Sequence, residues 1–176
     1  MKFVDIGLAG AWLVEQSPAR DTRGAFTEMW ERELFERHGL FSSIDQVSTA
    51  YNENNYTLRG MHFQSEPYPQ AKLVSCIAGA CYDVMVDLRA NSPTFKSWRA
   101  FELSADRACA VYIPAGFAHG YLTVRPRTTV HYLIAGKYSP SHGCGVRWND
   151  PAFGIEWPAL PAVIAPRDAG FPDFSG

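Results

Sequence analysis

The amino-acid sequence predicts an all-β domain, a sandwich or barrel built from many short strands. Short apolar runs alternate with clusters of Pro, Gly, Asn and Ser along most of the 176 residues, and this regular spacing is typical of such folds. The hydrophobic content of 47% suffices for one globular domain with a full-sized core. Since no internal repeat or linker divides the chain, we expect a single domain over residues 1–176.

The N-terminal part contains the one segment with helical periodicity. Residues 1–20 predict one or two short strands, which a turn signal follows. Phe26, Trp30 and Leu34 then recur every four residues. This spacing predicts a helix over residues 26–38, and the glycine that comes next is well placed to end it.

The rest of the chain predicts strands and an irregular tail. Apolar runs of strand length follow one another, each bounded by turn residues. The tail from Ser139 to Gly176 is rich in Pro and Gly, so we expect it to wrap the barrel as irregular structure. The predicted strands span residues 45–50, 57–64, 71–78, 80–88, 98–103, 109–113, 119–124 and 128–134.

Charge and cysteine content narrow the classes of function. The net charge of −2 and the pI of about 6.2 provide no basic surface, so we expect no nucleic-acid partner. No apolar run approaches membrane-spanning length, and Asp5 interrupts the apolar start that a signal peptide needs, so we expect no membrane partner. The 4 cysteines form no Cys-x-x-Cys pair, which indicates reduced thiols in a cytoplasmic protein.

The segment Leu58–Gln64 places a histidine in the middle of a short apolar strand. The period of two in a strand puts His62 on the same face as Gly60. Arg59 then faces the other way, unless Gly60 allows a β-bulge that re-aims it. Considered alone, His62 is either a hydrogen-bonded core histidine or a functional group.

Further strands carry polar groups that a closed barrel brings together. Lys72 shares a strand face with Val74, unless it extends out to water. Asp83 and Asp87 share one face of the next strand, where they either point to solvent or line a wet cavity. A Pro-x-Gly-x-x-His sequence makes a tight turn that delivers His119 onto its strand.

That turn, together with the all-β pattern, resembles the second motif of the cupin superfamily. The resemblance implies a cupin-type jelly-roll barrel, also called a double-stranded β-helix, with one or two short helices. Metal-binding cupins add a His-x-His pair and a Glu on the earlier strand, where this chain has only His62. Because a transition metal wants several His or carboxylate ligands, His62 and His119 alone make a poor site. We therefore expect neither a metal nor another cofactor.

Further matching segments lie along nearly the whole chain, at residues 21–28, 58–64, 71–72, 83–89, 92–95, 113–120, 138–140, 148–151, 155–158 and 167–168. Through these segments the sequence resembles the dTDP-4-dehydrorhamnose 3,5-epimerase family, a metal-free branch of the cupins. So many matches in the same order are far more specific than any single motif. The resemblance implies an isomerase that inverts C3 and/or C5 of a nucleotide-linked 4-keto-6-deoxyhexose, such as dTDP-4-dehydro-6-deoxy-D-glucose, in rhamnose-type deoxysugar biosynthesis.

The resemblance implies a catalytic role for four residues. The C4 ketone acidifies the protons on C3 and C5, and His62 is the base that removes one, since imidazole changes charge near neutral pH. Asp168 pairs with this histidine and favours its charged form. Lys72 stabilises the enolate, and Tyr132 returns a proton on the opposite face. Tyr138 is close to Tyr132 in the sequence and is the alternative donor.

The resemblance also implies nucleotide binding and assembly. Arginines suit a diphosphate because the guanidinium makes paired, charge-assisted hydrogen bonds. Tyr138 is a candidate for stacking on the base, and His119 and Asp83 match pocket residues whose role is positioning and charge balance. In this family the N-terminal segment crosses to a partner subunit, so we expect a homodimer. The predicted substrate-binding residues are Arg23, Glu28, Gln46, Arg59, His119, Asp83, Tyr138 and Arg167.

Departures from the family pattern leave the substrate open. Ala25 replaces a large aromatic residue, residues 46–52 differ from the usual order, and Gly143 or its neighbour replaces a glutamate. These changes are on the nucleotide side. A single-site 3- or 5-epimerase, a ketoisomerase, and a catalytically silent nucleotide-sugar-binding cupin are the alternatives. The predicted base and acid argue against a pure binding protein, which needs neither.

Overall fold

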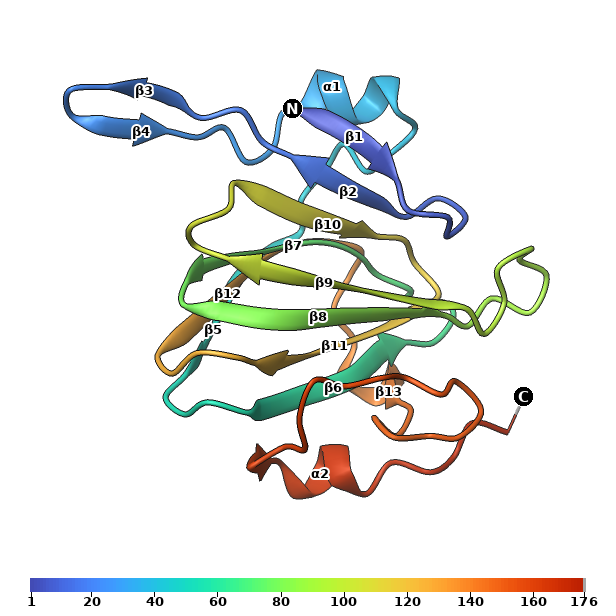
Figure 1. Ribbon diagram of the computed structural model, residues 1–176. Coiled ribbons are helices and arrows are strands. Elements are labelled where there is room, and N and C mark those ends of the chain that lie inside the picture. The colour runs from blue at the N-terminus through green and yellow to red at the C-terminus, as the bar shows by residue number, and fades with distance from the viewer. Residues whose placement is uncertain (176) are drawn as a thin grey trace.

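The computed structural model describes residues 1–175 and consists mainly of two facing antiparallel sheets (Figure 1). The first sheet has the order β1-β2-β10-β7-β12-β5, and the second has the order β13-β6-β11-β8-β9, with β14 parallel to β6. The predicted all-β fold is confirmed, and the two sheets form a cupin-type jelly roll.

The bounds of the strands agree closely with the apolar runs of the sequence. The first sheet contains β1 (Lys2–Asp5), β2 (Trp12–Glu15), β5 (Gln46–Asn52), β7 (Ala71–Ala78), β10 (Cys109–Ile113) and β12 (Thr128–Ala135). The second contains β6 (Thr57–Gln64), β8 (Ala80–Asp87), β9 (Trp98–Ser104), β11 (Phe117–Thr123), β13 (Gly143–Gly145) and β14 (Val163–Ile164). The remaining elements are β3 (Ala19–Asp21), β4 (Gly24–Phe26), α1 (Arg32–Arg37), the 3-10 helix η1 (Pro140–His142) and α2 (Pro166–Ala169).

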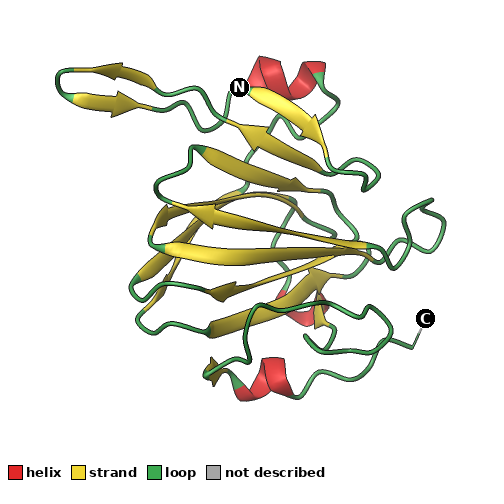
Figure 2. Ribbon diagram, in the orientation of Figure 1, coloured by secondary structure: helices red, strands yellow, loops and turns green. Residues whose placement is uncertain are grey.

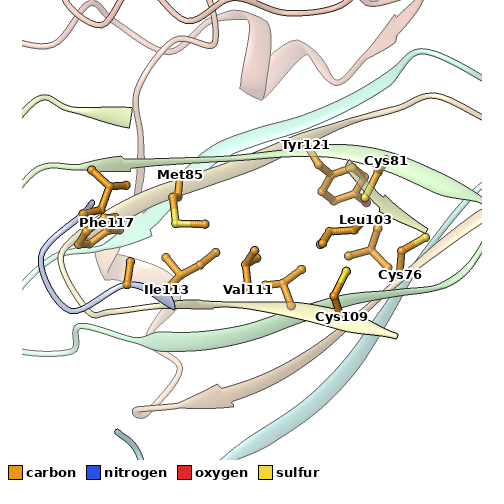
Figure 3. Close-up of a cluster of buried hydrophobic side chains, with 13 residues drawn as sticks. Cys76, Cys81, Met85, Leu103, Cys109, Val111, Ile113, Phe117 and Tyr121 are labelled. Carbon is orange, nitrogen blue, oxygen red and sulfur yellow. The ribbon is translucent and has the colours of Figure 1, made fainter. Parts of the chain in front are cut away.

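The main hydrophobic core lies between the two sheets (Figure 3). Because side chains alternate along a strand, each sheet contributes every second residue to this space. Val74 and Val111 come from the first sheet and pack against Met85 and Phe117 of the second, and all four are almost fully buried. The core fixes the distance between the sheets, and with it the walls of the cavity described below.

A second core on the outer face of the first sheet holds α1. Phe35 of this helix is fully buried against Trp30 and Tyr112. Glu31 caps the helix, because its carboxylate accepts hydrogen bonds from two backbone N–H groups of the first turn. The helix is shorter than the predicted 26–38, since Phe26 belongs to β4 and is 77% exposed.

The hairpin β3–β4 projects away from the barrel beside β1 and β2 (Figure 1). All its residues are exposed, and its turn is held by an ion pair in which Arg23 Nη2 lies 2.6 Å from Asp21 Oδ2. The turn predicted at this position is confirmed. Among residues 1–175, little covers the apolar ring of Phe26, which is 77% exposed.

The C-terminal tail returns to β6 and is mostly irregular, as expected (Figure 2). β13 pairs with residues 62–64, and β14 pairs with Thr57 and Leu58. The short helix α2 follows and contacts β6. This return places Asp168 against the middle of the strand. No helix among residues 1–175 is long and apolar enough to cross a membrane.

Candidate active site

A cavity of about 310 Å³ lies between the sheets, and residues of both sheets line it. The second sheet contributes His62 and His119, and the first contributes Lys72 and Tyr132. A smaller hollow of about 180 Å³ adjoins it, shares His62 and Lys72, and adds Arg167. The larger cavity is also lined by Gln46, Ser48, Thr49, Ala50, Arg59, Gln70, Gly120, Tyr121, Ile134 and Tyr138.

A bulge in β6 turns both Arg59 and His62 toward this cavity. His62 pairs with His119 and Arg59 pairs with Tyr121, so one more residue separates the pair on β6 than on β11. Gly60 has a φ of +122°, and a Cβ there would lie 2.5 Å from the Gly120 Cα. Only glycine fits this position, and of the two orientations considered for Arg59 the re-aimed one is found.

His62 and Asp168 form a hydrogen-bonded pair at the cavity wall. His62 Nε2 lies 2.8 Å from Asp168 Oδ1, and the Gly60 N–H donates to Oδ2 at 2.9 Å. Burial alone raises the pKa of the Asp168 carboxyl, but the hydrogen bonds from His62 and Gly60 outweigh it and hold the pKa below its usual value. An ionised carboxylate only accepts, so Nε2 carries the proton and Nδ1 keeps the lone pair. The histidine side chain is 41% exposed, which leaves it accessible to a substrate.

A second histidine–aspartate pair lies deeper in the barrel. His119 Nε2 lies 2.8 Å from Asp83 Oδ2, and both side chains are buried. The other carboxylate oxygen, Oδ1, is buried and has no hydrogen-bond partner among residues 1–175. Asp83 therefore faces inward rather than to solvent, where its charge acts on the groups around the cavity.

Asp87 is also buried, but it serves the loop that follows β8. Its carboxylate accepts hydrogen bonds from Arg89, Ser92 and Thr94. Burial opposes ionisation, yet these bonds lower the pKa of Asp87 to about 2. Of the two inward acids of β8, only Asp83 has a role near the cavity.

Lys72 lines the cavity and does not extend to open solvent. Its Nζ donates to the His62 carbonyl oxygen at 3.5 Å. Burial lowers the pKa of Lys72 to about 8, against which the charge of Asp83 acts only in part. The ammonium is therefore charged at neutral pH and available to an anionic oxygen in the cavity.

Tyr132 faces the same cavity from the first sheet, opposite His62 of the second. Its ring lies edge-on to that of His119, with centroids 6.1 Å apart. Burial raises the pKa of Tyr132 well above its usual value, and the neighbouring Tyr121 adds to the rise, so the phenol stays protonated at neutral pH. Tyr138, the alternative donor, lies at the rim and is 63% exposed.

The sequence analysis did not single out two buried polar residues near the cavity, Asn52 and Tyr121. Asn52 is buried and accepts a hydrogen bond from Arg59 Nε at 2.8 Å, while its Nδ2 lies 3.1 Å from the Tyr121 hydroxyl. The period of two predicts that Tyr121 shares the inward face of its strand with His119. No alternating pattern of this kind predicts that Asn52 is buried, because turn-forming residues follow it.

Two predicted binding residues lie outside the cavity of their own chain. Arg23 is in the turn of the projecting hairpin, and Glu28 follows that hairpin; both are exposed. The structure gathers the other predicted residues in or directly behind the cavity walls: His62, Lys72, Tyr132, Asp168, Gln46, Arg59, His119, Asp83, Tyr138 and Arg167.

No group of three or more His, Cys, Asp and Glu side chains in the described part of the chain is arranged to hold a metal ion. His62 and His119 each direct Nε2 to a carboxylate rather than toward a shared point. A histidine held by a carboxylate, a charged ammonium and a protonated phenol line the cavity, and such groups suit proton transfer and anion binding.

Comparison with known proteins identifies similar chains over nearly the full length. The family model described as dTDP-4-dehydrorhamnose 3,5-epimerase matches residues 5–176. The protein of that name from Escherichia coli is 39% identical over 96% of this chain and 91% of its own. A crystal structure of the Bacillus anthracis dTDP-4-dehydrorhamnose 3,5-epimerase with TDP and PPi bound superposes with a TM-score of 0.94 at 40% identity, covering 98% of this chain and 99% of that one. A 3'-monoepimerase from Streptomyces bikiniensis in complex with dTDP-quinovose gives 0.88 at 34% identity, covering 96% and 85%.

Proposed function

The chain belongs to the dTDP-4-dehydrorhamnose 3,5-epimerase family and is a carbohydrate epimerase of deoxysugar biosynthesis. From that premise we propose how its residues invert carbon centres of the sugar. The substrate is a nucleotide-linked 4-keto-6-deoxyhexose. We propose that it is dTDP-4-dehydro-6-deoxy-D-glucose, inverted at both C3 and C5. The observation that supports the proposal is that His62 and Tyr132, the proposed base and acid, line one cavity from opposing sheets.

His62 is the proposed base. Its Nε2–H is held by Asp168, so the lone pair on Nδ1 accepts the proton from the carbon beside the ketone. The ionised Asp168 stabilises the imidazolium that forms, as in other histidine–aspartate pairs. The electron pair of the broken C–H bond forms a double bond to C4, and the ketone oxygen on C4 becomes the enolate oxygen.

Lys72 is the proposed partner of that enolate oxygen. It lines the cavity beside His62 and carries a positive charge at neutral pH. A charge already in place where the oxyanion develops needs no reorganisation during the reaction, which is why such groups usually make the largest catalytic contribution.

Tyr132 is the proposed acid. It projects from β12 of the first sheet, whereas His62 projects from β6 of the second. A sugar ring between the sheets then presents one face to the base and the other to the phenol. A proton removed by one residue and returned by the other inverts the carbon.

The nucleotide is proposed to lie along the open rim of the cavity. Arg59 and Arg167 supply guanidinium groups for the diphosphate, and Gln46 and Tyr138 lie nearby for the sugar and base. The relative from Bacillus anthracis, whose structure holds TDP and PPi, supports dTDP as the nucleotide.

We also propose that the protein is a cytoplasmic homodimer in which the hairpin β3–β4 completes the neighbour's site. Arg23 and Glu28 lie outside their own cavity, and Phe26 presents an uncovered ring on the same hairpin. A partner subunit offers this hairpin a place to bury that surface. The free thiols suit the reducing cytoplasm.

Incubation with dTDP-4-keto-6-deoxyglucose in deuterated water tests the proposal. Deuterium at both C3 and C5 of inverted product is the expected result. Deuterium at one carbon only would assign a single-site epimerase activity instead. This outcome has to be distinguished from double inversion because the chain is also similar to the Streptomyces bikiniensis 3'-monoepimerase. No label at either carbon would contradict catalysis on this substrate.

A further inference from the structure

The tail that brings Asp168 to His62 also brings an aromatic residue, Phe171, which has no part in the proposed proton transfers. Phe171 follows Asp168 by three residues and is half-buried. The centroid of its ring lies 5.8 Å from that of the His62 imidazole, and the two planes meet at 78°. Aromatic rings attract one another in this nearly perpendicular arrangement. One short segment of the tail therefore holds the proposed base twice, by a hydrogen bond and by a ring contact.

Gly145 makes the room in which the Phe171 ring lies. This glycine of β13 is directly opposite His62 of β6. The side chains of directly opposed residues project from the same face of a sheet and are neighbours there. Gly145 has no side chain, and a Cβ at this position would overlap the Phe171 ring. The ring of Phe171 therefore takes the place of the cross-strand neighbour that His62 lacks.

His62 needs such a neighbour because one hydrogen bond fixes only one atom of its ring. The bond from Nε2 to Asp168 leaves the imidazole free to turn about that atom, and the side chain is 41% exposed. The proposed reaction requires that Nδ1 points at the substrate carbon, and a misplacement of about 1 Å can slow a reaction by about a hundredfold. A ring packed nearly at right angles to the imidazole limits this rotation.

Phe171 also contacts Arg167, a proposed ligand of the diphosphate. The guanidinium carbon lies over the Phe171 ring, 5.7 Å from its centroid, at a distance that allows a cation–π interaction. Arg167 has a further anchor, because its Nη2 donates to the Gly143 carbonyl oxygen at 3.3 Å. Arg59 supplies a second guanidinium to the cavity. Loss of the Phe171 ring should therefore affect the base more than the binding of the nucleotide.

We infer that Phe171 is a positioning residue, which sets the plane of the His62 imidazole and so aims Nδ1 at the substrate carbon. This inference rests on the proposed function of His62 as the base. Phe171 neither gives nor takes a proton, and its contribution is to the geometry of proton removal. Its loss should lower kcat and leave KM nearly unchanged.

The test measures deuterium exchange into dTDP-4-keto-6-deoxyglucose by Phe171→Ala and by wild type. We expect exchange at the substrate carbons to be slower by about tenfold to a hundredfold, with KM and the affinity for dTDP within about threefold of wild type. The resonance of the His62 Nε2 proton, measured by NMR, should persist in the variant, because Asp168 still accepts its hydrogen bond.

Phe174→Ala is the matched control, because it removes an aromatic ring from the same tail. The Phe174 ring also has a cation over it, since Lys96 Nζ lies 5.2 Å from its centroid, and it packs against Phe153 at 5.3 Å. It has no contact of this kind with His62. Phe174→Ala should loosen the tail and keep the wild-type kcat.

Gly145→Ala tests the same contact from the other strand. The backbone of Gly145 is not in the left-handed region, so alanine fits its conformation and only the Phe171 ring opposes it. We expect Gly145→Ala to displace the ring and to slow exchange as Phe171→Ala does. In the double variant the added methyl group finds free space, so the two losses should not add.

Four results would overturn the inference. Exchange by Phe171→Ala at the wild-type rate shows that the ring has no role, and equal losses in Phe171→Ala and Phe174→Ala show that it only anchors the tail. Disappearance of the Nε2 proton resonance in Phe171→Ala shows that Phe171 acts through Asp168. Additive losses in the double variant show that Gly145 and Phe171 act separately. Wild-type enzyme that exchanges no hydrogen removes the proposed function itself, whereas an active wild type confines any failure to Phe171.

Discussion

Asp168 binds His62 and the backbone of the β6 bulge with one carboxylate: Oδ1 lies 2.8 Å from His62 Nε2, and Oδ2 accepts the Gly60 N–H at 2.9 Å. The same side chain thus sets the tautomer of the histidine and stabilises the bulge that aims it. Loss of the carboxylate affects both the chemistry and the fold, and these effects can be measured apart.

Asp168→Asn should lower stability in a pH-dependent way. Because the pKa of Asp168 is lowered in the folded state, its stabilisation is fully present above the unfolded value near 3.9 and is lost as pH falls through the folded pKa. We expect the variant to lose about 1–3 kcal/mol at pH 7 and progressively less toward acid pH, measured by urea unfolding. Asp106→Asn removes an exposed ion pair and should change little; an equal effect from both variants would contradict the assignment.

His62→Ala should abolish exchange at the substrate carbons while nucleotide binding survives. Removal of a positioned base costs on the order of a hundred- to ten-thousand-fold. The diphosphate contacts are assigned to arginines such as Arg59, so dTDP affinity by calorimetry should match wild type. His38→Ala, on the surface near α1, is the control. Normal exchange by His62→Ala would place the base elsewhere.

Tyr132→Phe should separate proton removal from proton return. The ring and its packing remain, but the donor is gone, so the original proton exchanges with solvent without inversion of the carbon. The measurement is the ratio of deuterium incorporation to epimerised product by NMR. Epimerisation at the native rate would point instead to Tyr138 or to a water molecule.

Lys72 should set the alkaline limit of activity. Its ammonium is charged below its pKa of about 8 and loses its proton above it, so kcat/KM should fall as pH rises through that value. Lys72→Arg keeps its charge and should move this limit to higher pH, while Lys72→Met should lose about a hundred- to a thousandfold at pH 7. An unchanged alkaline limit in Lys72→Arg would show that another group titrates there.

Mixed dimers should reveal whether Arg23 serves the neighbouring subunit. If the hairpin crosses to the neighbouring subunit, a heterodimer of one His62→Ala chain and one Arg23→Ala chain contains one intact site. That site combines the native His62 of the second chain with the native Arg23 of the first. If it stays with its own chain, neither site is intact. We therefore expect the mixture, after exchange of subunits, to be more active than the two separate variants combined. A protein that sediments as a monomer at micromolar concentration would contradict the dimer itself.

The sequence predicted most strands because each is a short apolar run between turn residues. β6, β7 and β10 have the bounds expected for them. The helix was overextended because Phe26 fits the helical spacing only by coincidence; its environment is a projecting hairpin, which no local pattern reports. Conversely, the bulge at Gly60 could be stated only as an alternative, since it depends on the close approach of another strand.

The site was predictable to a different degree for each residue. The cavity positions of His62, Lys72 and His119 follow from strand alternation once the barrel is assumed. Asp168 could be assigned only by resemblance, because the return of an irregular tail to β6 leaves no periodic signal. Asn52 was missed for a related reason: its burial arises from long-range contacts with Tyr121 and Arg59 that the sequence around it does not encode.

The late position of Asp168 has a consequence for biosynthesis. All strands that wall the cavity are complete by Ala135 of β12, and the carboxylate that orients His62 arrives only with α2. Because chains fold from the N-terminus as they are made, a nascent chain can close its barrel while His62 still lacks this partner. The proposed base therefore gains its carboxylate partner only once α2 has emerged, later in synthesis than every strand that walls the cavity.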